Sequence, residues 1–169
     1  MVFEFCPRCT STHVQMENHY RLECLHCGFV YFHNVAAAVA VVLKFENKVL
    51  FTIRNNEPDK GKLDLPGGFV DPGERGELAA CREIKEELGL DLDVSKLKYI
   101  TSAPNNYLYK TVLYKTLDLF FEYELDAAAI HIEAPDEIQS IAWIDPKVMD
   151  VDAIGFSSIR TVIKERYRN

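Results

Sequence analysis

The residues of this chain best suited to chemistry are acidic and lie close together. Within the run 82–88, Glu83, Glu86 and Glu87 would lie near one another if the run is helical, because positions three and four apart are neighbours on a helix. Such carboxylates repel one another unless a cation lies between them, and Mg²⁺ prefers oxygen ligands. The run therefore predicts either a divalent-cation site or a solvated helix face with intrahelical ion pairs.

A glycine turn precedes the acidic run. Pro66, Gly67 and Gly68 follow a short strand expected at 63–65, and glycine lets a backbone turn sharply. The carbonyl of Gly67 is therefore a further candidate ligand for the same cations. Cations held there would polarise a phosphoryl oxygen, so the predicted chemistry acts on a phosphate group.

Cysteines form a second cluster near the start of the chain. Two C-x2-C pairs are separated by 14 residues, namely Cys6 with Cys9 and Cys24 with Cys27. This spacing is typical of a tetrahedral, structural zinc site, and the segment has too few large aliphatic residues to form a core without metal. We predict a zinc ribbon with four cysteine ligands over residues 1–34; the alternative is four unligated thiols. The fifth cysteine, Cys81, is expected in the core.

Composition limits the classes of function. The chain has 169 residues, 48% of them apolar, which suits one domain with a small appendage. A net charge of −7 disfavours nucleic acid as the main partner, because phosphate binding depends on Lys and Arg. No apolar stretch approaches the ~18 residues of a membrane span, and residues 1–5 do not resemble a secretory signal. We therefore expect a cytoplasmic protein without a membrane partner.

Residues 35–169 are predicted to form one α/β domain. Patterns of apolar residues predict strands at 35–43, 48–54, 63–65, 97–102, 116–125 and 137–144. The first two strands would form a hairpin across Glu46 and Asn47. Helices are expected at 74–88 and 157–168, with inward-facing stripes of Leu78, Cys81, Ile84 and Leu88 in the first and Ile159, Val162, Ile163 and Tyr167 in the second. This order predicts a sandwich around a mixed sheet.

The glycine turn and the acidic run together resemble the box of the Nudix hydrolase family. The motif G-x5-E-x7-R-E-U-x-E-E-x-G-U, with U an aliphatic residue, is matched at every fixed position from Gly68 to Leu90. The resemblance covers about residues 43–144. It implies an α/β/α sandwich and Mg²⁺- or Mn²⁺-dependent hydrolysis of nucleoside diphosphate derivatives.

The resemblance also implies roles for particular residues. The catalytic cation would be held by Gly67, Glu83, Glu86 and Glu87, while Arg82 and Glu74 would tie the box together. The general base would be a box glutamate or an acid of a later loop, where the candidates are Glu133, Asp136 and, as the one we select, Glu137. Candidates for substrate binding are Arg54 for phosphate and Tyr107 and Tyr109 for a purine ring; surface charge and strand packing are the alternatives.

A zinc ribbon in front of such a domain resembles the NADH pyrophosphatase branch of the family. The bridge at 31–34 fits this branch, whereas the residues at 101–107 differ from its downstream array. The expected substrate is therefore NADH, ADP-ribose or a related nucleotide, cleaved to a nucleoside monophosphate. The alternatives are a nucleotide sensor without activity, or processing of RNA ends guided by the ribbon. A homodimer is the default expectation for the assembly.

Overall fold

The computed structural model describes residues 3–18 and 20–168 of the chain. The chain divides into two compact units, Met1–Val35 and Ala36–Asn169, each of which is described by itself. Within the described residues, no helix is long and apolar enough to cross a membrane.

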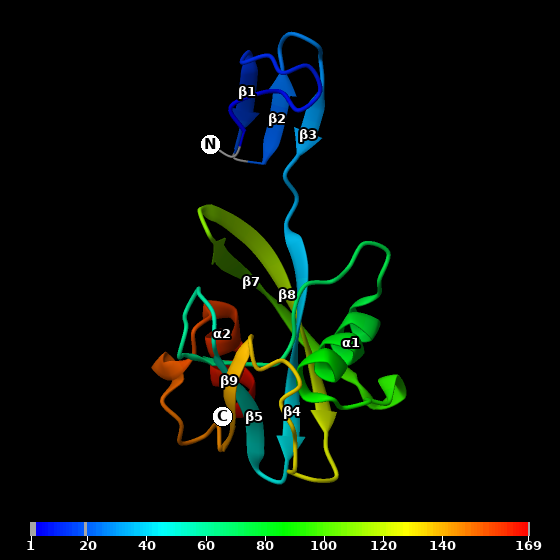
Figure 1. The fold of residues 1–169 in the computed structure, drawn as a ribbon. Coiled ribbons are helices and arrows are strands. Elements are labelled where there is room, and N and C mark those ends of the chain that lie inside the picture. The colour runs from blue at the N-terminus through cyan, green and yellow to red at the C-terminus, as the bar shows by residue number, and fades with distance from the viewer. Residues whose placement is uncertain (1–2, 19, 169) are drawn as a thin grey trace. The chain divides into compact units, whose positions relative to one another are not determined.

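The first unit is a three-stranded antiparallel sheet (Figure 1). Its strands are β1 (Val14–Glu17), β2 (Arg21–Cys24) and β3 (Val30–Phe32). Among residues 3–18 and 20–35, the buried side chains are Leu22, Cys6 and Cys24. One large aliphatic side chain between two thiols is a very small core, which agrees with the expectation that this segment depends on another source of stability.

The second unit is built on a six-stranded mixed sheet. Its strands are β4 (Ala36–Phe45), β5 (Lys48–Arg54), β6 (Leu63–Asp64), β7 (Lys98–Tyr109), β8 (Val112–Glu124) and β9 (Ile138–Ile144). Their order is β6-β5-β4-β8-β7, with β9 paired to β5. The β4–β8 pair is parallel and the other pairs are antiparallel, so the prediction of a mixed sheet is confirmed.

Two helices cover opposite faces of this sheet, α1 (Gly76–Leu88) and α2 (Ser157–Tyr167) (Figure 1). Alternate residues of β4 enter the two cores, because side chains of a strand point to opposite faces. Val39, Val41 and Leu43 pack with α1, whereas Ala40 and Val42 pack with α2. The α/β/α sandwich is therefore confirmed. Short 3-10 helices occur at Val94–Lys96 and Val151–Ala153.

The structure corrects the predicted apolar stripe of the first helix. Ile84 and Leu88 are buried as predicted, but Leu78 is 42% exposed and Cys81 is only partly buried. The other buried positions of the helix are Ala79, Ala80 and Glu87. The prediction relied on large apolar side chains. The face that packs on the sheet instead includes small alanines, because these let the helix lie close to the sheet. The helix therefore presents one of its carboxylates to the interior.

The hairpin of β7 and β8 is longer than predicted. The strands remain paired from Lys98 with Glu122 to Tyr109 with Val112, and Lys110 in the turn has a φ of 53°. The aromatic and polar residues at 103–109 and 112–118 therefore belong to the sheet, where alternate side chains share a face. In α2 the predicted inward positions Ile159, Val162 and Ile163 are buried, and Tyr167 packs partly buried against the same core.

Candidate functional site

Arg82 connects the acidic side chains around α1. Its Nε and Nη2 donate to the two oxygens of Glu74 at 3.0 Å each, and Nη2 also donates to the Phe69 carbonyl. Its Nη1 donates to Glu83 at 2.8 Å and to Glu86 at 3.2 Å. The predicted pairing of Arg82 with Glu74 is confirmed, and this two-point contact fixes the segment before the helix.

Glu87 lies against the glycine turn rather than with Arg82. Its side chain is 9% exposed, and Oε2 accepts a hydrogen bond of 3.0 Å from the Gly67 N–H. Gly67 has a φ of 147°, and a Cβ there would overlap the Val39 carbonyl. A Cβ on Gly68 would overlap the Glu83 carboxylate. Close approach of the backbone therefore requires glycine at Gly67, whereas a side chain at Gly68 would displace the Glu83 carboxylate from the turn.

The electrostatics of the cluster are unfavourable to its negative charges. Burial raises the pKa of Glu87 well above its ordinary value; the Gly67 N–H opposes this shift, and repulsion from Glu83 adds to it. Burial also raises the pKa of Glu83, against the effect of Arg82. A buried carboxylate with one backbone partner and acidic neighbours requires either a proton or a cation.

These oxygens are suitable ligands for a divalent cation. The carbonyls of Pro66 and Gly68 accept hydrogen bonds from the N–H groups of Val41 and Val39, whereas that of Gly67 has no hydrogen-bond donor among the described residues. A free carbonyl next to Glu87 and Glu83 supplies only oxygen donors, as Mg²⁺ and Mn²⁺ require. Glu86, with 59% of its side chain exposed, lies at the outer edge of this set.

A cavity of about 910 Å³ opens from the carboxylates, a volume that suits a small-molecule ligand. Its lining includes Gly67, Gly68, Glu83, Glu86 and Glu87. Of the three acids proposed for the later loop, Asp136 and Glu137 line it, whereas Glu133 packs against Gly89 at the end of α1. Glu137 also contributes to the raised pKa of both Glu83 and Glu87, so it lies within electrostatic reach of both.

The predicted substrate-binding residues line the same cavity. Arg54 is held in place because Nη1 donates to Asp64 at 2.6 Å and Nε donates to the Pro58 carbonyl at 2.7 Å. Although burial opposes it, Asp64 raises the pKa of Arg54, so the guanidinium stays charged. The guanidinium also lies 4.8 Å from the centre of the Phe156 ring.

The two predicted tyrosines form an aromatic wall. The rings of Tyr107 and Tyr109 are stacked, with 6.4 Å between their centres, and the Tyr107 ring also contacts the rings of Phe69 and Phe156. Beside the cavity, a second and mainly apolar hollow of about 510 Å³ is lined by Ala36, Phe69, Tyr107, Tyr109 and Tyr114. The same rings therefore pack within the sheet and also line the cavity, so strand packing does not exclude contact with a substrate.

Sequence reasoning did not identify a polar set at another part of the cavity, formed by Asn105 of β7 and Thr116 and Asp118 of β8. All three are buried. The signal was the alternation of polar residues in these strands, but it can be recognised only once the strands are known to extend through 103–118. The structure also places Asp64 at the cavity, a residue for which the sequence predicts no role.

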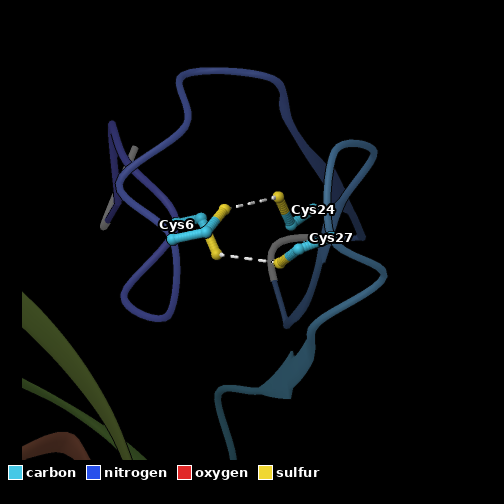
Figure 2. Close-up of side chains that lie close together, drawn as sticks. Cys6, Cys24 and Cys27 are labelled. Atoms are coloured by element: carbon cyan, nitrogen blue, oxygen red, sulfur yellow. Dashed lines mark hydrogen bonds between the residues drawn. The ribbon is translucent and has the colours of Figure 1, made fainter.

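The four cysteines of the first unit come together. Their sulfur atoms lie within 4.8 Å of one another, with 3.8 Å between Cys6 and Cys27 and 3.6 Å between Cys9 and Cys24 (Figure 2). Tetrahedral ligands at the ~2.3 Å length of a Zn–S bond would be about 3.8 Å apart. Although desolvation opposes it, the backbone N–H groups of Cys27 and His26 lower the pKa of Cys24 to about 7. The cluster can therefore hold a metal ion.

Comparisons with known proteins agree with this arrangement. A family model described as NUDIX domain matches residues 33–164. The chain is 46% identical over 76 residues to an ADP-ribose pyrophosphatase of Methanocaldococcus jannaschii, covering 45% of the chain and 44% of that protein. It is 29% identical over 140 residues to an NAD-capped RNA hydrolase NudC of Salmonella heidelberg, covering 83% of the chain and 51% of that protein. The chain thus spans about half the length of these curated relatives.

Solved structures show the same fold. A NUDIX hydrolase from Nitrosomonas europaea aligns over 99% of this chain and 94% of that chain, with a TM-score of 0.68 and 20% identity. The NUDIX domain of NrtR from Shewanella oneidensis, solved with ADP ribose, aligns over 81% of this chain and 90% of that chain, with a TM-score of 0.62 and 20% identity.

Proposed function

The chain belongs to the NUDIX family, and on this premise we propose that it hydrolyses the diphosphate linkage of a nucleoside diphosphate derivative, with Mg²⁺ or Mn²⁺ as cofactor. The proposed substrates are NADH, ADP-ribose and related dinucleotides, and the proposed product is a nucleoside monophosphate. The names of the two curated relatives, which refer to ADP-ribose and to NAD-capped RNA, support this class of substrate.

The observation that carries the proposal is the position of Glu87. A buried carboxylate beside Glu83, with the Gly67 N–H as its partner, lies in a cavity large enough for a nucleotide. Glutamate at such a position costs stability unless a cation is bound. A chain that only senses a nucleotide has no need of this charge, so the arrangement favours the enzyme over the sensor.

Each residue has a proposed role in the reaction. Glu83, Glu86, Glu87 and the Gly67 carbonyl would hold the cation. When bound, the cation supplies positive charge to the phosphate oxygens and makes water more acidic. Arg54 would donate hydrogen bonds to the diphosphate, and its contacts with Asp64 and Pro58 fix its direction in advance.

Glu137 is the proposed general base. It would accept a proton from the attacking water as the new bond to phosphorus forms and the bridging oxygen leaves with the second phosphate. Tyr107 and Tyr109 would stack against a ring of the substrate at the aromatic wall.

We further propose that residues 1–34 form a structural zinc ribbon. The sulfur spacing supports zinc bound by four thiolates, which leaves no open position for chemistry. Cytoplasmic location would keep these thiols reduced. The location, the homodimer and the minor role of nucleic acid as a partner stay predictions.

A substrate panel tests the activity. Purified protein is incubated with Mg²⁺ and NADH, ADP-ribose, a diadenosine polyphosphate or NAD-capped RNA, and the products are identified by mass spectrometry. We expect AMP from NADH and ADP-ribose, and no product when EDTA is present. Absence of any phosphate product across the panel, from protein that is folded and supplied with Mg²⁺ or Mn²⁺, would refute the proposal in favour of a sensor.

A further inference from the structure

A set of buried polar side chains lies on the sheet face below α2. The cross-strand register places Asn105 opposite Thr116, and Asp118 lies two residues farther along β8 on the same face. Asn105 is 9% exposed and Asp118 is 7% exposed, yet both line the cavity. Polar groups at such depth are costly unless hydrogen bonds satisfy them, so their presence here requires a reason.

The Asp118 carboxylate is only partly satisfied by the protein. Its Oδ1 accepts from the Thr116 hydroxyl at 2.6 Å, and its Oδ2 accepts from the Ser158 hydroxyl at 2.6 Å. A carboxylate offers about four acceptor positions. These two hydroxyls fix the carboxylate between β8 and α2, and acceptor capacity remains for a donor that enters from the cavity.

Asn105 supplies the complementary donor. Its Oδ1 accepts from the Ser157 hydroxyl at 3.3 Å. Its Nδ2 donates to no other group among the described residues. An amide has two N–H donors, so they are available at the cavity. One part of the cavity thus presents a fixed acceptor and a donor on neighbouring strands.

The surroundings of this pair suit a flat ring. Ala38 and Ala40 of β4 line the cavity beside it, and their small side chains leave room above the sheet. Phe156, Ile159 and Tyr107 provide apolar and aromatic walls. Flat apolar walls with a few fixed polar groups are the usual features of a site that selects one ring among several.

We propose that this part of the cavity binds adenine, with Asp118 accepting a hydrogen bond from the exocyclic amino group and Asn105 donating one to a ring nitrogen. The assignment deepens the proposed function, on which it rests, because adenine is the base of both NADH and ADP-ribose. Arg54, which contacts Phe156 of the same wall, then lies where the phosphates of such a nucleotide would leave the base site.

Equilibrium binding tests the assignment without any hydrolysis. The affinity of the full chain for AMP is compared by calorimetry in EDTA with that for purine riboside 5′-monophosphate, which lacks the amino group. A charge-assisted hydrogen bond predicts a preference for AMP of roughly 10–100-fold. Because only binding is measured, a chain that hydrolyses no diphosphate still gives a clear result for this site.

Two variants separate the roles of the polar residues. Asp118→Asn keeps the shape of the side chain and is expected to reduce the preference for AMP by roughly tenfold. Asn105→Ala is expected to weaken both ligands by about three- to tenfold and to keep the preference, because both carry the ring nitrogen. Should Asp118→Asn fail to fold, the wild-type preference and Asn105→Ala still decide the question.

Glu122→Gln is the matched control. Glu122 lies on the same strand and also accepts a hydrogen bond from a hydroxyl, that of Tyr167 at 2.7 Å, but it does not line the cavity. We expect it to retain the affinity and the preference of the wild type. Equal binding of the two ligands by the wild type, or an unchanged preference in Asp118→Asn, would overturn the assignment.

Discussion

The Glu87 carboxylate accepts a hydrogen bond of 3.0 Å from the N–H of Gly67, and this contact joins α1 to the glycine turn. The two residues are twenty positions apart in the sequence. The contact buries a negative charge next to a carbonyl that has no partner of its own among the described residues, so the two oxygens can share a cation. Stability and activity should therefore make opposite demands on this position.

We first predict opposite effects of Glu87→Gln on activity and on the stability of metal-free protein. The amide removes a buried charge and can still accept from Gly67, so in EDTA the variant should gain about 1–2 kcal/mol, or roughly 2–8 °C in Tm. Turnover with Mg²⁺ should fall by at least about 100-fold, because a metal ligand is lost. Glu77→Gln, at an exposed position of the same helix, should change neither quantity.

The same residue predicts a dependence of stability on pH. Because burial raises its pKa, folded Glu87 retains a proton that the unfolded chain releases above its ordinary value of 4.5. The contribution of protonated Glu87 to the free energy of unfolding is therefore fully present below pH 4.5, and it is lost as the pH rises through the pKa of the folded state. In EDTA, the wild type should lose stability relative to Glu87→Gln as the pH rises. A constant difference between their denaturation midpoints would contradict this.

The sequence was sufficient for the parts of the site that lie close together along the chain. The spacing of Glu83, Glu86 and Glu87 fixes their relation through helix geometry, and the two C-x2-C pairs likewise fix the cysteine cluster. Contacts across the sheet were not predictable in this way. The pairing of Asn105 with Thr116 depends on the length and register of the β7–β8 hairpin, for which the local sequence gives no clear turn signal.

Helix orientation was the other limit. Leu78 was expected inside because it is large and apolar, yet Ala79 and Ala80 lie against the sheet. The choice between these faces is made by how closely the backbone can approach β4, which is a tertiary effect. It could not be read from periodicity, since both faces contain apolar residues at helical spacing.

A second prediction concerns the loop that carries Glu137. The side-chain amide of Asn55 donates to the Pro135 carbonyl at 3.0 Å, and that of Asn56 donates to the Asp136 carbonyl at 2.9 Å. Replacing both asparagines with alanine keeps the backbone hydrogen bond from the Asn55 N–H to the Glu137 carbonyl but removes the two side-chain contacts. We expect kcat to fall by about tenfold with little change in Tm, because the exposed loop is then positioned less precisely. Steady-state kinetics measure this.

The double-mutant cycle separates positioning from a general structural effect. If the asparagines act through Glu137, their replacement should have no further effect on kcat in a Glu137→Gln background. Additive losses would show that the tether serves another part of the site. Asn106→Ala is a suitable control, because Asn106 contacts Lys115 on the β7–β8 hairpin, outside the cavity.

A third prediction distinguishes Arg54 from an ordinary surface charge. Arg54→Lys keeps the positive charge but cannot contact Asp64, the Pro58 carbonyl and a phosphate at once. We expect KM for a diphosphate substrate to rise by about 10–100-fold with a smaller change in kcat. Arg160→Lys, which alters an arginine bound to the Gly155 carbonyl outside the cavity, should leave KM unchanged. An unchanged KM in Arg54→Lys would exclude a role in binding phosphate.

The fourth prediction concerns the cysteine cluster and separates its role from that of the carboxylates. Metal analysis of purified protein should find about one zinc per chain, and Cys24→Ser should lose it, because the tetrahedral set is then incomplete. Amide exchange should accelerate in residues 3–18 and 20–35 but not in the sheet of the second unit, since the small core around Leu22 cannot hold the first unit together. Cys81→Ser, which alters the cysteine of α1, should retain the zinc. We expect the metal because the four sulfur atoms lie within 4.8 Å of one another. Zinc retained in Cys24→Ser, or wild-type protein without zinc, would contradict the zinc ribbon.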